Sequence, residues 1–400
     1  MRKISINRMY FLMGLYFIVA NFAHPITPTF IQNLGLNDYM FGVAFAAMAL
    51  TNFLFSPFWG KLASNIGSTR IISFGFIGYA IAQGIFGLAT TEAGIVVGRL
   101  LAGLFNGAII VNQMIYIMDN STLENRGRNL AISATITSVV SPFGYLIGGV
   151  LGDYSIPLTF TIQVIGLFIV GIINWLVLDD KPIKDKQPLK QLAKDSNPVR
   201  IVIDAKSLLT PVLISFFVVA IATSFASISY DQSFNYFIKD QYGFPPSYNG
   251  FLKAIVGFIT LIANSTICMW LLRKTDINKS IIYVLSICLA MMIAIVMIND
   301  IVPFIIINVI FFGFNAVYLP LMQSILAKFN RTEGSGGVLV GMFNSMRSFG
   351  MVFGSLFAGF IYTVGPKLAF VFSGVAFFIS VVFAYICYVQ ISKERKLAND

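Results

Sequence analysis

The 400-residue sequence is poor in charged side chains, histidine and cysteine. Charged residues make up 11% of the chain, and it has one histidine and three cysteines. Soluble domains carry about 25% charged residues, whereas 57% of this chain is hydrophobic, so a soluble fold would lack the polar side chains to cover it. This composition excludes a soluble enzyme, a nucleic-acid-binding domain and a disordered chain. It favours a helical membrane protein.

The cysteine positions and the motifs that the sequence lacks further limit which kinds of membrane protein it can be. Cys268, Cys288 and Cys387 lie inside apolar runs without a CxxC motif, so we expect no metal site and no disulfide framework. The chain has no GxxxxGK[ST] loop, so we expect neither ATP hydrolysis nor another cofactor. Its net charge of +10 is spread between apolar runs and does not indicate nucleic acid as a partner. The first apolar run is too long for a cleavable signal peptide.

Apolar runs long enough to cross a bilayer recur along the whole chain. A span needs about 20 mostly apolar residues, and runs this continuous exclude a β-barrel. The sequence therefore predicts an all-α integral membrane protein with twelve transmembrane helices. The expected spans are 9–33, 39–60, 70–90, 93–118, 128–151, 157–178, 208–237, 247–272, 280–298, 301–327, 335–362 and 368–390.

The basic residues between these spans predict the orientation. With the N-terminus inside, the outer loops hold only Lys239 and Lys367, and all other basic residues outside the spans are cytoplasmic. Because positive charge accumulates on the cytoplasmic side, both termini are expected to be cytoplasmic.

The longest polar stretch divides the chain into two similar halves. We expect six-helix bundles at 1–178 and 207–400, joined by a cytoplasmic linker at 179–206 that is either a solvated connection or a regulatory element. The turn LGLNDYMFG at 34–42 resembles YGFPPSYNG at 242–250, with the same spacing of glycines. Two similar halves indicate an internally repeated transporter.

Four sequence stretches resemble signatures of the major facilitator superfamily. They are HPITPTFIQNLGLNDYMFG from His24, GKLASNIGSTR at 60–70, RLLAGLFNG at 99–107 and GYLIGGVLG at 144–152. The second matches a loop signature at Gly60, Gly67 and Arg70 but has Ser64 in place of the usual Asp. The fourth resembles the span-5 signature of drug:proton antiporters at Gly144, Gly148 and Gly149, with Tyr145 in place of Pro.

This resemblance implies a major facilitator fold and roles for the residues of the signatures. Lys61 and Arg70 would hold the inner turn when the cytoplasmic side closes, and Asp119 is the nearest acid. The three span-5 glycines have either a packing role or a coupling role. The resemblance also implies alternating access around a cavity between the halves.

Polar side chains follow one face of spans 1, 4, 7 and 10, the spans that line the cavity in the resembled fold. They line a substrate cavity or form hydrogen bonds between helices. The predicted cavity residues, together with Arg347 of span 11, are Asn21, Arg99, Asn106, Gln113, Ser227, Asn235, Asn315 and Arg347.

Ionisable side chains inside the spans are few. Asp231 is the only acid there and the first choice for the coupled proton, the alternative being a static ion pair with Arg99 or Lys253. His24 is the second choice, or else a packing residue. We expect His24, Arg99, Lys253 and Asp231 to be able to form one outer network. Arg347 binds an anionic group or serves as a salt-bridge partner.

The sequence favours a monomeric secondary transporter of the cell membrane that exports a small organic solute or drug by proton antiport. Uptake or exchange of an anionic metabolite is the second transport hypothesis, because bases outnumber acids within the spans. A membrane-embedded enzyme is a remote alternative, since His24 and Asp231 are too deep to meet a water-soluble donor. A sensor without transport activity is equally remote.

The orientation is tested by reporter fusions. A reporter fused after residue 190 should be cytoplasmic, and one inserted at 240–245 should be external, because of the distribution of basic residues. Alkaline phosphatase and green fluorescent protein activities measure the two sides. The opposite pattern would overturn the span assignment.

Overall fold

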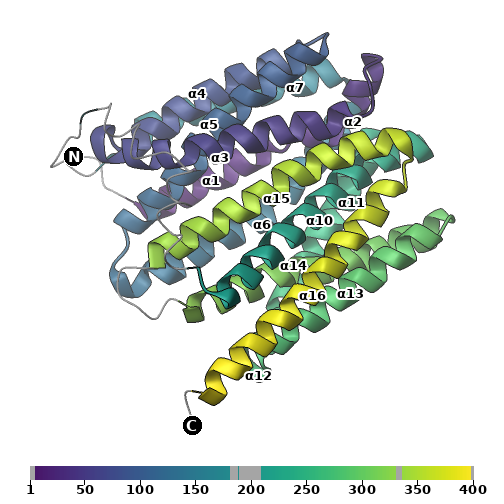
Figure 1. Cartoon of the computed structure of the whole chain (residues 1–400). Coiled ribbons are helices and arrows are strands. Elements are labelled where there is room, and N and C mark those ends of the chain that lie inside the picture. The colour runs from purple at the N-terminus through teal and green to yellow at the C-terminus, as the bar shows by residue number, and fades with distance from the viewer. Residues whose placement is uncertain (1–4, 181–187, 189–208, 330–335, 398–400) are drawn as a thin grey trace. The chain divides into compact units, whose positions relative to one another are not determined.

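The computed structural model describes residues 5–180, 188, 209–329 and 336–397, so most of the expected linker lies outside the described residues. These residues form helices and no strand (Figure 1). Twelve helical segments are long and apolar enough to cross a membrane, which confirms the predicted all-α fold. The helices are α1 (Ile6–Ala20), α2 (Ala23–Asn33), α3 (Met40–Ile66), α4 (Ser68–Gly87), α5 (Glu92–Asp119), α6 (Leu123–Tyr154), α7 (Ile156–Val177), α10 (Pro211–Tyr242), α11 (Pro246–Ala263), a π-helical turn (Asn264–Cys268), α12 (Met269–Lys274), α13 (Ile277–Met297), α14 (Ile301–Phe329), α15 (Gly336–Val364) and α16 (Leu368–Leu397).

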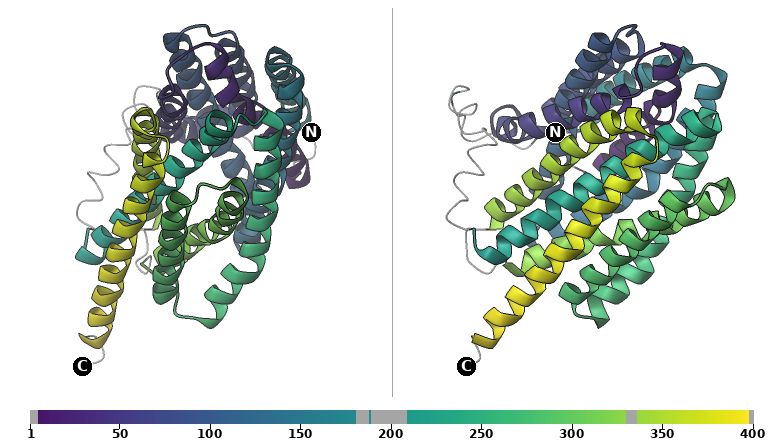
Figure 2. Two further views of the ribbon diagram at one scale, coloured as in Figure 1. Left: turned by 90° about the vertical axis from the view of Figure 1, so that its right-hand side faces the viewer. Right: turned by 45° about the vertical axis from the view of Figure 1, so that its right-hand side comes forward.

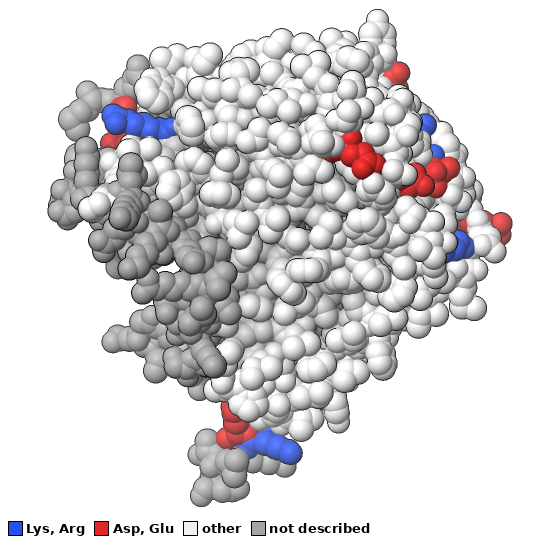
Figure 3. All heavy atoms as spheres, turned by 45° about the horizontal axis from the view of Figure 1, so that its top comes forward, with Lys and Arg blue, Asp and Glu red and all other residues white. Residues whose placement is uncertain are grey.

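The surface is apolar where a bilayer would touch it. On the face in Figure 3, the described charged side chains form small groups near the margins, and the area between them is uncharged. Large apolar side chains such as Phe11, Trp175 and Trp270 are more than half exposed. Such a surface is stable against lipid tails and not against water.

The helices group into two compact units. Unit 1 comprises Met1–Pro198 and Asn235–Gly257, and unit 2 comprises Val199–Phe234 and Phe258–Asp400. The outer end of α10 and most of α11 therefore belong with the N-terminal helices. The boundaries expected at residues 178 and 207 remain a prediction.

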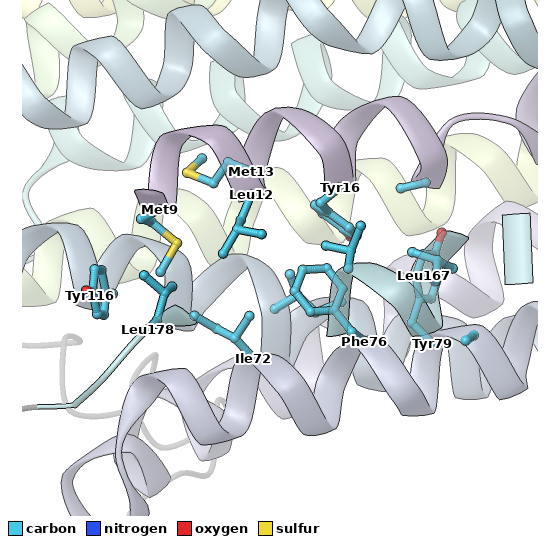
Figure 4. Close-up of a cluster of buried hydrophobic side chains, with 14 of the residues drawn as sticks. Met9, Leu12, Met13, Tyr16, Ile72, Phe76, Tyr79, Tyr116, Leu167 and Leu178 are labelled. Carbon is cyan, nitrogen blue, oxygen red and sulfur yellow. The ribbon is translucent and has the colours of Figure 1, made fainter. Parts of the chain in front are cut away.

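The core of unit 1 forms from apolar faces of helical periodicity. The buried residues of α1 recur at steps of three and four, as do those of α4, and the two sets point toward each other (Figure 4). At their centre the ring of Tyr16 meets Phe76 edge-on, with 5.2 Å between centroids. The labelled members of this cluster are Met9, Leu12, Met13, Tyr16, Ile72, Phe76, Tyr79, Tyr116, Leu167 and Leu178.

Unit 2 has an aromatic core. Tyr230 of α10 packs against Phe311 and Phe312 of α14, with ring centroids 4.4 and 5.4 Å away, and against Phe370 of α16 at 5.5 Å. Helix α13 runs along both α14 and α16 (Figures 1 and 2). Rings of this size contribute packing energy that a membrane interior cannot supply through the hydrophobic effect.

The two repeated turns both hold a glycine in the left-handed region of backbone conformation. Gly35 follows α2 with φ of 64°, and Gly243 follows α10 with φ of 65°. In each turn the next amide returns to an earlier carbonyl: Leu36 to Ile31 at 3.4 Å, and Phe244 to Ile238 at 3.4 Å. Glycine is favoured here because a left-handed residue ends each helix. The two turns therefore share a left-handed glycine, and the internal repeat of the halves remains a prediction.

The first span is broken in its middle. Helix α1 ends at Ala20 and α2 begins at Ala23, because Pro25 has no amide hydrogen to continue the helical pattern toward Asn21. Local backbone bonds continue across the interruption, since the Phe22 amide donates to Val19 O at 3.2 Å and the His24 amide donates to Asn21 O at 3.3 Å. The Gln163 amide of α7 adds bonds to Val19 O at 3.1 Å and to Ala20 O at 3.0 Å, so a buried side chain supplements the local bonds.

The span-5 glycines bring α6 into backbone contact with this break. A Cβ on Gly144 would lie 2.3 Å from Ile18 O, and one on Gly148 would lie 2.4 Å from Phe22 O. The neighbouring Gly149 faces another helix, since its Cβ would lie 2.6 Å from Pro246 O at the start of α11. Helix α6 is therefore packed between the broken span and α11.

Carboxylates tie the outer ends of the helices of unit 1 together. The Tyr236 hydroxyl of α10 donates to Asp38 in the first outer turn, and its ring stacks on Phe41 with 4.7 Å between centroids. Asp153 at the end of α6 accepts from the Ser247 amide at 3.0 Å, in the first turn of α11. A carboxylate at a helix N-terminus is electrostatically favourable.

Gly148→Ala should destabilise the protein by about 1 to 3 kcal/mol, because the added methyl overlaps the backbone of Phe22. Gly84→Ala is the matched control, since its methyl would lie 3.8 Å from Val164, an ordinary contact. Thermal melting in detergent measures both variants. A Gly148→Ala protein as stable as the control would show that α6 is not held against the break.

Tyr236→Phe should lower the unfolding free energy by about 1 to 2 kcal/mol, because Asp38 loses its donor while the ring still stacks on Phe41. The control is Tyr39→Phe, which removes a hydroxyl that donates to Glu92 near the surface at 2.7 Å. The control should shift the melting temperature less, since solvent replaces that bond. Equal shifts in the two variants would contradict the importance of the Asp38 contact.

Candidate functional site

The polar stripe of unit 1 is partly engaged in bonds between helices. The Tyr16 hydroxyl of α1 donates to Asn106 Oδ1 on α5. Asn21, at the break of span 1, donates to Phe17 O of its own helix at 2.6 Å. These two asparagines keep the break and α5 in place, and each has a further polar atom on its side chain.

Arg99 is a buried cation without a carboxylate beside it among the described residues. Its side chain is 4% exposed, and its guanidinium carbon lies 3.8 Å from the centre of the Phe86 ring. One nitrogen donates to Thr27 Oγ1 at 3.0 Å, and another lies 3.8 Å from Met48 Sδ. The Phe86 ring stabilises the positive charge. The Nε of Arg99 has no hydrogen-bond acceptor among the described residues.

The other ionisable residues of the spans divide between the two units. His24, just past the break, stacks on Tyr145 of α6 with 5.3 Å between ring centroids. Lys253 of α11 is also buried in unit 1. Asp231 is half-buried on α10 in unit 2. The outer network expected among these side chains and Arg99 remains a prediction.

The polar stripe of unit 2 joins two helices. Ser227 of α10 donates to Asn315 Oδ1 of α14 at 2.8 Å, so these two predicted cavity residues do lie together. Arg347 of α15 is half-buried, and its guanidinium carbon lies 5.7 Å from the centre of the Phe343 ring. Among the described residues it contacts no carboxylate.

Several predicted cavity residues carry a buried polar atom that has no hydrogen-bond partner in the described part of the chain. Buried polar atoms are almost always paired with protein or water, so such atoms indicate where water or a solute completes the structure. The atoms are Arg99 Nε, Gln113 Nε2, Asn235 Oδ1 and Arg347 Nε.

The inner turn between α3 and α4 has glycines where space or backbone conformation requires them, and its charged signature residues are exposed. Gly67 has φ of 93°, which favours glycine, and a Cβ on Gly60 would lie 3.3 Å from Val111. Lys61, Arg70 and Asp119 are all exposed. Asp180, which follows α7, contacts this turn through the Thr69 amide.

The residues that the sequence analysis missed are single polar groups at the edges of apolar runs. Gln163 lies inside the sixth span, and Asp180 directly follows it. Tyr236 and Asp38 flank the repeated turns. The two amide side chains of the sixth span, Gln163 and Asn174, were a usable signal, whereas the partner of each residue was not visible in the sequence.

The comparisons with known proteins agree with this architecture. Multidrug resistance protein 1 of Bacillus subtilis (strain 168) is 25% identical over 389 residues, covering 95% of this chain and 96% of that protein. Multidrug resistance protein 2 of the same strain is 22% identical over 352 residues, covering 88% and 86%. The inward-facing, unoccupied crystal structure of a bacterial homolog of the human lysosomal transporter Spinster has a TM-score of 0.77 at 14% identity, with 97% of both chains covered.

The family model described as Major Facilitator Superfamily matches residues 9–338. This match covers most of the chain, and the relatives and the fold are those of transporters and not of enzymes. The chain therefore belongs to the major facilitator superfamily of multi-pass membrane transporters.

Proposed function

We propose that the protein exports a small organic solute or drug across the cell membrane in exchange for protons, by alternating access, as a monomer with both termini in the cytoplasm. The observation that carries this proposal is the broken first span, which places Asn21 and His24 on either side of a helix interruption. Broken helices hold the substrate and ion sites of many secondary transporters. Two relatives are named as multidrug resistance proteins, which supports drugs as substrates.

The substrate would meet the polar side chains of the cavity spans. Gln113 and Asn235 have unpaired polar atoms that a solute or its water can bind. Four other predicted cavity residues already form one hydrogen bond each, and each would offer its remaining donor or acceptor capacity to the substrate. They are Asn21, Asn106, Ser227 and Asn315.

Asp231 is the proposed proton carrier, with His24 as the second choice. It is the only acid within the spans predicted from the sequence, and it follows Ser227 at helical spacing on α10. Burial disfavours the charged carboxylate, whereas a nearby cation favours it. Substrate and proton can therefore exclude each other from this carboxylate, which is the requirement for exchange.

A second candidate is uptake or exchange of an anionic metabolite. It is favoured by Arg99 and Arg347, which lie in the spans without a carboxylate partner among the described residues. A buried cation without a counter-charge is costly, and an anionic substrate would supply that charge.

The two candidates are separated by flux into proteoliposomes. A pH gradient is imposed, and cationic, neutral and anionic fluorescent compounds are compared, beginning with ethidium and carboxyfluorescein. Drug:proton exchange requires that substrate addition change the internal pH. Transport of the anion alone would favour the second candidate, and transport of neither class by an oriented, folded protein would contradict both.

Asp231→Asn should abolish transport that is driven by a pH gradient, because the amide resembles a permanently protonated acid. It should retain downhill exchange of substrate, since the conformational change no longer waits for a proton. Asp240→Asn is the matched control, because it removes an acid from the outer end of the same helix, where Gln32 donates to it at 3.3 Å. An Asp231→Asn protein that still concentrates substrate would move the coupling role to His24.

A further inference from the structure

The carboxylate of Asp180 occupies the start of α4. Its Oδ1 accepts from the Thr69 amide at 2.9 Å and from Ser68 Oγ at 3.2 Å, and its Oδ2 accepts from Thr69 Oγ1 at 2.6 Å. The first amides of a helix have no partner within the helix, and the local dipole favours negative charge. Asp180 therefore satisfies the first turn of α4 from a position far away in the sequence.

The inner turn is shaped to admit this carboxylate. A Cβ on Gly67 would lie 2.1 Å from Asp180 Oδ2 and 2.4 Å from its Cγ, so any other residue at position 67 would displace the carboxylate from its observed place. Ser68 and Thr69 are 7% and 5% exposed, so the contact is sheltered from solvent. Hydrogen bonds to a charged group are stronger in such surroundings.

Helix α7 holds the same turn at a second point. Asn174 Nδ2 donates to Thr69 O at 3.0 Å and to Ser73 Oγ at 2.8 Å. The end of α7 and the residues directly after it thus clamp the first turn of α4 on both its amide and its carbonyl side. Asp179 is the neighbouring acid, and Asp119 is exposed at the end of α5.

We propose that Asp180 is an acidic positioning residue of the inner turn. By fixing Ser68 and Thr69 it fixes the backbone from which Arg70 projects into solvent. The rate of the conformational step then depends on Asp180, whereas substrate affinity does not, since Asp180 lies at the inner end of α7 and outside the proposed cavity residues. This inference holds for any substrate or coupling ion.

The test compares Asp180→Asn with Asp179→Asn, which removes an adjacent acid of the same charge. Downhill exchange of ethidium or of carboxyfluorescein, whichever the wild-type protein carries faster, is measured in proteoliposomes without a pH gradient. Asp180→Asn should lower the maximal rate at least about fivefold with KM unchanged, the effect expected for losing charge-assisted bonds in a step that limits turnover. Asp179→Asn should match the wild type.

Thr69→Val provides a second, milder variant, because it deletes one of the donors to Asp180 and leaves the amide. Its effect on the maximal rate should be smaller, and the double variant with Asp180→Asn should be no slower than Asp180→Asn alone, because both act through one contact. If Asp180→Asn does not fold, the maximal exchange rate of Thr69→Val is compared with that of Asp179→Asn, and a lower rate in Thr69→Val supports the proposal.

An Asp180→Asn protein with wild-type rate, a change confined to KM, or additive effects in the double variant would overturn the proposal. A wild-type protein that exchanges no compound would instead count against the proposed function. Loss of proton coupling alone leaves this exchange assay unaffected, so the two failures are distinguishable.

Discussion

Backbone groups that lose their helical bonds inside a membrane need another hydrogen-bond partner, because lipid cannot supply one. This protein meets that requirement at the break of span 1, where Gln163 bonds the carbonyls of Val19 and Ala20. It meets it again at the start of α4, where Asp180 and Asn174 bond both sides of Thr69. These side chains add to the local backbone bonds that already cross the break, and they stabilise the first turn of α4.

The glycines of span 5 allow α6 to pack closely against the backbone at the break of span 1. Because Gly144 and Gly148 lack side chains, α6 reaches the backbone on which the interruption is built, and Gly149 brings the same helix to the first turn of α11. Close backbone contact supplies van der Waals energy where the hydrophobic effect between helices is absent. The span-5 signature therefore has a packing role in unit 1, whatever role it also has in coupling.

The candidate site was predictable as a set of residues but not as a set of contacts. Helical spacing identified the polar faces of spans 1, 4, 7 and 10, and Ser227 and Asn315 do meet. Spacing along one helix did not indicate that Asn106 accepts from Tyr16 or that Arg99 lies over Phe86. Tyr16 and Phe86 are aromatic residues of other helices, so they are not part of a polar stripe. The sequence suggested Asp119 as the acid nearest to the inner turn, and this role remains a prediction. It did not indicate that Asp180, which follows α7, contacts that turn.

The sequence by itself determined the twelve membrane-spanning segments and the repeated outer turns. Bilayer thickness acts on each apolar run separately, and a glycine with positive φ ends a helix through bonds to its own neighbours, as at Gly35 and Gly243. Only the tertiary structure decided which side chain completes each interrupted backbone. Gln163 and Asp180 reach their partners because helices distant in the sequence pack side by side, and that packing depends on the shapes of both surfaces at once.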